Sequence, residues 1–152
     1  MRAGTDTETA YDHARVPVWE IETQAHRGAL EAVQAALETF LEGQAVARPL
    51  RLRASLLVEE AFMNAVMHAV AGSADPLLRL RALLPPGELV LQLDDRGQPF
   101  EPEGAAARGA AADPAEGPLG GRGLLLMQRL AQHVARERLG EVNRLTLRLL
   151  RE

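Results

Sequence analysis

The sequence predicts an α+β fold, a two-layer sandwich in which three helices cover one face of a mixed, mostly antiparallel sheet. The first observation is length, because 152 residues suffice for one two-layer core but not for two. The second is the order of periodic segments: strand, helix, helix, strand, strand, a long unpatterned stretch, helix, strand and strand. The third is composition, because 47% hydrophobic and 25% charged residues are typical of globular domains.

The chain begins with a polar, acidic stretch, so residues 1–12 are expected to form a flexible tail before a single domain at 13–152. Residues 14–22 are typical of a strand. Pro17 has no N–H to donate to a neighbouring strand, which restricts this strand to a sheet edge.

The remaining elements follow from periodicity and turn residues. Hydrophobic residues recur at helical spacing from 24 to 41, and Gly43 ends that helix. Pro49 suits the first turn of a second helix, which is expected to reach about Val70. Later elements are strands at 77–84 and 88–95, a helix at 124–134, and a closing hairpin with strands at 134–139 and 143–150.

Residues 96–119 are rich in Gly, Ala and Pro and have no apolar periodicity. Segments of this length inside a compact domain are usually functional or disordered. Motifs flank both ends, so a lid is expected at about 98–119; the alternative is an insertion without function.

Composition excludes several kinds of chemistry. The chain has no cysteine, which excludes disulfides and thiolate catalysis, and no lysine, which excludes a P-loop and Schiff-base chemistry. Its net charge of −4 argues against direct nucleic-acid binding. No signal peptide or membrane-spanning apolar run is present, so the protein is expected to be cytoplasmic.

The second predicted helix carries a polar stripe. Because successive residues of an α-helix turn by about 100°, Glu60, Asn64 and His68 lie on one side, at the margin of the apolar face. Glu59 points elsewhere, toward solvent. The stripe is either a solvated helix face or a site in which the Asn64 amide ligates Mg²⁺ and Glu60 accepts a proton.

The strand at 88–95 ends in a carboxylate. Alternation places Asp95 on the face of the core leucines, where an unpaired carboxylate is costly. Its partner is a purine amino group, a backbone N–H or an arginine such as Arg96. Gly97 allows a flat ring or backbone to approach, and Asn143 of the last strand shares the inward face near Asp95.

Glycines follow the unpatterned segment. Gly120, Gly121 and Gly123 directly precede the predicted helix, where backbone N–H groups bind phosphate. The alternative is a flexible turn, which commonly contains glycines in the same arrangement.

Taken in order, these clusters resemble the N, G1 and G2 boxes of the Bergerat-fold (GHKL) ATPases. The closest resemblance is to the anti-sigma-factor serine/threonine kinases of bacterial partner-switching systems. The motifs are E-x-x-x-N-x-x-x-H from Glu60 to His68, D-x-G-x-P-F from Asp95 to Phe100, and G-G-x-G-L from Gly120 to Leu124.

The resemblance implies a Bergerat fold and a set of site residues. Glu60 is the implied catalytic base, and Asn64 the implied ligand of Mg²⁺. The implied ATP-binding residues are Asn64, His68, Asp95, Gly97, Phe100, Gly120, Gly121, Arg122, Gly123, Leu124 and Asn143. Two positions depart from the family pattern: Leu119 replaces a basic residue found in some such kinases, and Asn143 replaces a frequent threonine.

The same resemblance implies partners. They are a small antagonist protein with a serine or threonine phospho-acceptor, a sigma factor or similar regulator that the kinase sequesters, and a second copy of the chain in a homodimer. The alternatives are a nucleotide-binding module that acts by association alone, a histidine kinase catalytic domain, and half of a larger ATPase machine. The residues before the Asn64 helix offer no convincing dimerising helical hairpin, and no transducer domain is expected after the ATPase domain, so the last two alternatives are disfavoured.

Overall fold

The computed structural model describes residues 16–69, 76–99 and 119–151. The expected tail at 1–12 and Phe100 lie outside the described residues, as does almost all of the predicted lid.

The sheet has five strands in the order β1-β2-β3-β5-β4. The strands are β1 (Val18–Gln24), β2 (Leu77–Leu83), β3 (Glu88–Asp95), β4 (His133–Leu139) and β5 (Val142–Leu150). Every neighbouring pair is antiparallel, so the sheet lacks the mixed character that the sequence prediction allowed. β1 is an edge strand, as expected from Pro17.

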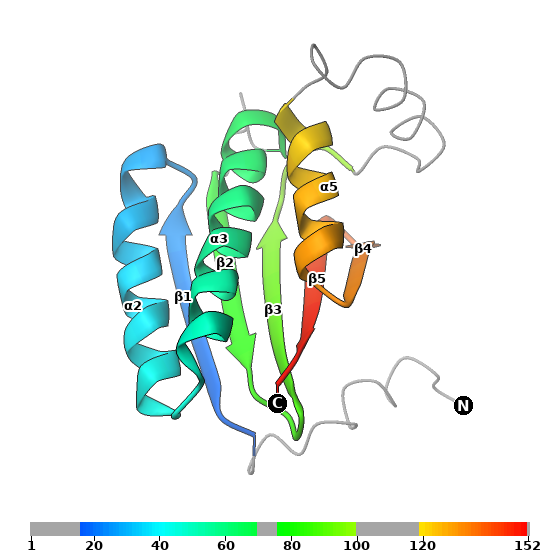
Figure 1. The fold of residues 1–152 in the computed structure, drawn as a ribbon. Coiled ribbons are helices and arrows are strands. Elements are labelled where there is room, and N and C mark those ends of the chain that lie inside the picture. Colours follow the sequence, from blue (N-terminus) through cyan, green and yellow to red (C-terminus); the bar gives the residue numbers. More distant parts are fainter. Residues whose placement is uncertain (1–15, 70–75, 100–118, 152) are drawn as a thin grey trace, which may run out of the picture.

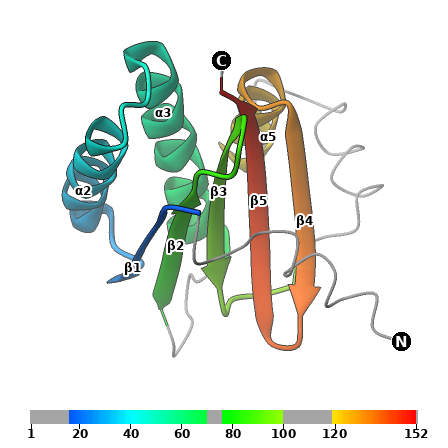
Figure 2. The same ribbon diagram turned by 90° about the horizontal axis from the view of Figure 1, so that it is seen from below.

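The helices all lie on one face of this sheet (Figures 1 and 2). They are the 3₁₀-helix η1 (Arg27–Ala29), α2 (Leu30–Gly43), α3 (Arg48–Asn64), the π-helix η2 (Ala65–Ala69) and α5 (Leu119–Leu130). The predicted two-layer sandwich with three long helices on one face is therefore confirmed. None of the described helices is both long and apolar enough to cross a membrane.

Two predicted helix boundaries were wrong. The last helix begins at Leu119 rather than 124, because packing against α3 overrides the low helix propensity of its glycines. It ends at Leu130 rather than 134, because the N–H of Gln132 donates to the Arg148 carbonyl (2.9 Å) and begins the pairing with β5. The second helix changes from α to π geometry after Asn64 and continues as a π-helix to Ala69, close to its predicted end.

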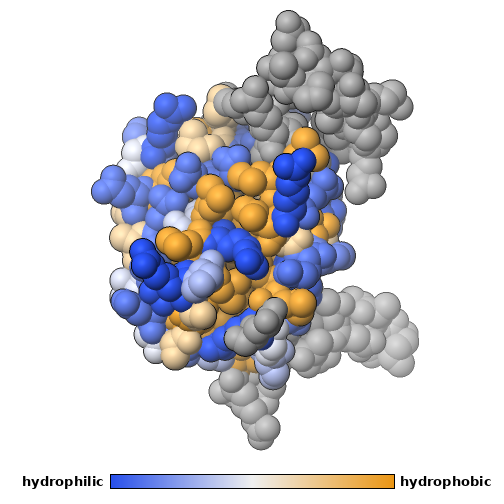
Figure 3. Space-filling model, in the orientation of Figure 1, coloured by the Kyte–Doolittle hydropathy of each residue, from blue (hydrophilic) through white to orange (hydrophobic). Residues whose placement is uncertain are grey.

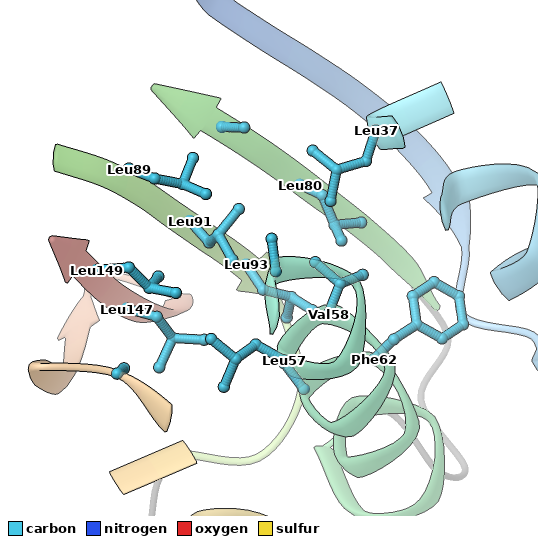
Figure 4. Close-up of a cluster of buried hydrophobic side chains, with 14 of the residues drawn as sticks. Leu37, Leu57, Val58, Phe62, Leu80, Leu89, Leu91, Leu93, Leu147 and Leu149 are labelled. Atoms are coloured by element: carbon cyan, nitrogen blue, oxygen red, sulfur yellow. The ribbon is translucent and has the colours of Figure 1, made fainter. Parts of the chain in front are cut away.

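The core lies between the helices and the sheet (Figure 4). Leu57 and Phe62 of α3 are fully buried in one hydrophobic cluster that also contains leucines of three adjacent strands, Leu80, Leu91 and Leu147. The same alternation that buries these leucines also points side chains at the end of β3 and at the start of β5 toward the helices. The polar residues at these positions therefore lie at the rim of the core.

The opposite face of the sheet is solvated and charged. Its ion pairs between neighbouring strands include Glu22–Arg79 (2.8 Å), Glu20–Arg81 (3.6 Å), Asp94–Arg144 (2.8 Å) and Glu88–Arg148 (3.4 Å). The hydrogen bond with Glu22, then the negative charges of Glu20 and Glu22, raise the pKa of Arg79 above its usual value.

Part of the surface on the helix side of the molecule is hydrophobic (Figure 3). Figure 3 shows hydrophobic side chains gathered near the middle of this side. The exposed large hydrophobic residues of the described helices are Leu52 and Leu56 of α3, Met67 of η2 and Leu125 of α5. An exposed apolar area of this kind is typical of a protein-binding surface.

The turn between α2 and α3 contains a strained alanine. Ala45 has φ of 59°, a left-handed conformation that disfavours any residue with a Cβ. We expect Ala45→Gly to raise the free energy of unfolding by about 0.5 kcal/mol, because relief of strain exceeds the added entropy of the unfolded chain. Urea denaturation measures this change. Ala35→Gly, on an exposed position within α2, is the control and should instead lower stability by about 1 kcal/mol.

Candidate functional site

Asp95 lies at the end of β3, 4% exposed, on the face that the helices cover. Its Oδ1 accepts hydrogen bonds from the Gly97 N–H (2.8 Å) and from Asn143 Nδ2 (2.8 Å). The backbone N–H partner was one of the predicted alternatives, and the predicted approach of Asn143 to Asp95 is confirmed. In the part of the chain that the structure describes, no hydrogen bond reaches Oδ2. One carboxylate oxygen is thus fixed and the other is left for a donor.

Asp94 takes no part in this arrangement. Its two oxygens accept from Arg144 Nε (2.8 Å) and Nη2 (2.9 Å) on the solvated face of the sheet. Strand alternation therefore distinguishes the two neighbouring carboxylates as predicted: Asp95 faces the helices and Asp94 faces away.

Glu60 and Asn64 lie one turn apart on α3, and both are half-buried. Gln34 of α2 donates to the Ser55 hydroxyl (3.1 Å) and to Glu59 (3.4 Å), which identifies the flank of α3 that faces α2. Because successive residues turn by about 100°, Glu60 and Asn64 lie on the other flank, toward α5. Glu59 is exposed, as predicted.

His68, which was predicted to continue this stripe, lies beyond the last α-helical residue of α3. It lies in η2, where the helix is π-helical, and its side chain is exposed. The alignment with Glu60 and Asn64 assumed α-helical rotation, which ends at Asn64. Single π-helical turns occur frequently at functional sites.

The glycine motif lies in the first turns of α5 instead of preceding the helix. The first four N–H groups of a helix have no intrahelical acceptor, and those of Gly120 and Gly121 belong to this set. The predicted use of these groups for phosphate is compatible with their position at a helix start. The side chains of 119–124, Arg122 and Leu124 among them, lie outside the described residues.

Arg138 of β4 is a site residue that the sequence analysis missed. Its Nη1 donates to Asn143 Oδ1 (2.9 Å) and to the Gly97 carbonyl (3.1 Å). The closing hairpin offered a signal, because strands that flank the Gly140–Glu141 turn pair Arg138 with Asn143. Both residues then face the same side as Asp95.

This geometry agrees with the comparison to known protein families. Residues 23–149 match the family model of the histidine kinase-like ATPase domain. The chain belongs to this family. No curated protein matches its sequence significantly.

Solved structures share the fold of this histidine kinase-like ATPase domain at low sequence identity. The RsbU and RsbW domains of Rv1364c from Mycobacterium tuberculosis align with a TM-score of 0.63 at 19% identity, over 89% of this chain and 32% of that one. The chain therefore spans about a third of that protein. The SiaB–SiaC complex from Pseudomonas aeruginosa aligns with a TM-score of 0.65 at 13% identity, over 95% of this chain and 96% of that one.

The donor set of the ATPase domain fits a magnesium ion held mainly by a nucleotide. Among residues 16–69, 76–99 and 119–151, no group of three or more histidine or acidic side chains is arranged to hold a metal. Mg²⁺ commonly uses one or two protein oxygens and takes its other ligands from water and phosphate. The half-buried amide of Asn64 is a ligand suited to that arrangement.

Proposed function

We propose that this protein is an ATP- and Mg²⁺-dependent protein serine/threonine kinase and anti-sigma factor. It phosphorylates a small antagonist protein and, in its other state, sequesters a sigma factor or similar regulator. The observation that carries this proposal is the state of the Asp95 carboxylate, of which only one oxygen is held by hydrogen bonds. Asp95 lies at the rim of the core, on the sheet face that is covered by α3, the helix of Glu60 and Asn64.

Asp95 would recognise the adenine ring. Its Oδ2 is available to accept a hydrogen bond from the 6-amino group, since Oδ1 holds Gly97 and Asn143. Gly97 lacks Cβ, so the base can approach the backbone beside it. Asn143 is fully buried, so it supports adenine binding through Asp95 rather than by direct contact.

Glu60 would act as the base on the substrate hydroxyl. The serine or threonine oxygen forms a bond to the γ-phosphorus, the bond from that phosphorus to the bridging oxygen breaks, and the hydroxyl proton passes to Glu60. Mg²⁺ would supply charge neutralisation at the phosphates. Asn64, one turn along α3, would ligate it, and the N–H groups of Gly120 and Gly121 at the start of α5 would bind the phosphates.

A protein partner is supported by the surface and by one relative. The exposed hydrophobic residues on α3, η2 and α5 belong to the helix layer that covers the sheet, as Glu60 of α3 does (Figure 1). The related SiaB–SiaC structure is a complex of two proteins. We therefore propose an antagonist protein as the phospho-acceptor, a sigma factor as the competing partner, and a homodimer as the working unit.

The test is transfer of label from [γ-³²P]ATP, with Mg²⁺, to a panel of small antagonist proteins of partner-switching systems. We expect one antagonist to acquire acid-stable label on serine or threonine. Acid-labile label on a histidine would contradict the proposal and favour histidine kinase chemistry. Association that depends on ATP or ADP without any label would favour the alternative, a regulatory module without phosphotransfer.

A further inference from the structure

We propose that Arg138 is a positioning residue for base recognition. It fixes the orientation of the Asn143 amide, and through it the orientation of the Asp95 carboxylate, and thereby sets the preference for a purine with a 6-amino group. This inference rests on the proposed nucleotide site and adds to it a residue that touches neither the base nor the phosphates.

Three strands contribute one residue each to a hydrogen-bonded row. Asp95 of β3 is directly opposite Asn143 of β5, which is directly opposite Arg138 of β4. Asn143 Nδ2 donates to Asp95 Oδ1 (2.8 Å), and Arg138 Nη1 donates to Asn143 Oδ1 (2.9 Å). The row therefore ends in a cation at β4 and a carboxylate at β3, with a buried amide between them.

The chemistry of the three groups permits only one orientation of the amide. A guanidinium group can only donate, so the amide oxygen must face Arg138. An ionised carboxylate can only accept, so the amide nitrogen must face Asp95. The second hydrogen of Nδ2 goes to the Gln98 carbonyl (2.6 Å), another acceptor. All three partners of Asn143 therefore require the same assignment of its oxygen and nitrogen.

Arg138 also holds the turn that follows Asp95. Its Nη1 donates to the Gly97 carbonyl (3.1 Å), and its Nε donates to the Gly140 carbonyl (2.9 Å) in the hairpin between β4 and β5. Gly97 donates its own N–H to Asp95 Oδ1 (2.8 Å). The Arg138 side chain thus links the closing hairpin to Gly97, the glycine beside which adenine is proposed to bind.

Removal of the guanidinium leaves the amide oxygen of Asn143 without this donor. The Gly97 carbonyl loses a donor as well, so the Asn143 side chain and the turn that together hold Asp95 Oδ1 are less firmly fixed, and the carboxylate is less well oriented. Affinity that depends on the 6-amino group should fall, whereas contacts to ribose and phosphate should remain. The expected change is therefore in base selectivity, not in nucleotide binding as a whole.

The experiment compares ADP with the diphosphate of purine riboside, which lacks the 6-amino group, by isothermal titration calorimetry. We expect wild type to prefer ADP, and Arg138→Met to reduce that preference about tenfold while the affinity for the analogue stays within about twofold. Arg138→Lys, which keeps a donor, should restore part of the preference. The matched control is Arg144→Met, which removes a less exposed arginine that binds the neighbouring Asp94 on the other face.

Each outcome is informative. Failure of wild type to bind ADP would refute the proposed function itself. A normal ADP preference in Arg138→Met, with ADP bound by wild type, would refute only the role of Arg138. An equal loss of ADP preference in Arg144→Met would show that the effect comes from loosening of the strand ends, and this result would also refute the role of Arg138. If Arg138→Met does not fold, Arg138→Leu, which also lacks a donor, takes its place, and the preference for ADP over the analogue decides in the same way.

Discussion

Glu60→Gln is expected to lower phosphorylation of the protein partner by at least about 100-fold, while ADP affinity stays within about twofold. Glutamine keeps the size of the side chain but cannot accept a proton from the attacking hydroxyl. Glu60 is half-buried on α3, beside Asn64, on the flank that faces α5. Initial rates of label transfer measure the first effect and calorimetry the second.

Glu59→Gln is the matched control for this experiment. Glu59 is the preceding residue of the same helix, but it is exposed and directed toward Gln34 of α2. We expect this variant to transfer phosphate at the wild-type rate. Equal rates in wild type and Glu60→Gln would show that another group accepts the proton, and a loss in both variants would point to damage to α3 instead.

Asp95→Asn is expected to weaken ADP binding by about 100-fold or more with little loss of stability. The new amide oxygen can still accept from Gly97 and Asn143, so the local fold keeps its hydrogen bonds. The amide nitrogen then replaces Oδ2 and presents a donor to the 6-amino group of adenine, which is itself a donor. Calorimetry with ADP and urea denaturation separate the two properties.

Asp94→Asn provides the comparison, since it is the same substitution one residue earlier on β3. It weakens the bidentate pair with Arg144 on the solvated face, and ADP affinity should change by less than about twofold. Comparable losses of affinity in the two variants, or tight ADP binding by Asp95→Asn, would contradict the assignment of Asp95 as the base-recognising group.

Much of the fold was predictable because its signals are local. Alternation along β3 correctly separated Asp95 from Asp94, and Pro17 correctly indicated an edge strand. The start of α5 was not predictable in this way, because its glycines disfavour a helix, whereas α5 as a whole packs against α3. The order that places β5 between β3 and β4 depends on contacts far apart in sequence, which no local pattern contains.

The site was predicted to a similar extent. Asp95 and Asn143 were predicted to lie close together, and they form a hydrogen bond. Arg138 was missed because an arginine on an edge strand is usually a solvated side chain, and its importance arises only from its partners across the hairpin. The change to a π-helix after Asn64, in the segment that contains His68, was not predictable because it leaves no mark in an apolar, helix-forming sequence.

The two neighbouring carboxylates of β3 also have a consequence for folding. Asp95 binds Asn143 on one face of the sheet, and Asp94 binds Arg144 on the other. A slip of β5 by one residue would turn every β5 side chain to the opposite face, so that Arg144 entered the core and Asn143 left it. Both carboxylates would lose their partners at once. The residues that orient Asp95, the proposed adenine-binding residue, therefore also disfavour a misaligned final hairpin. A molecule whose last strand is out of register cannot form the proposed site.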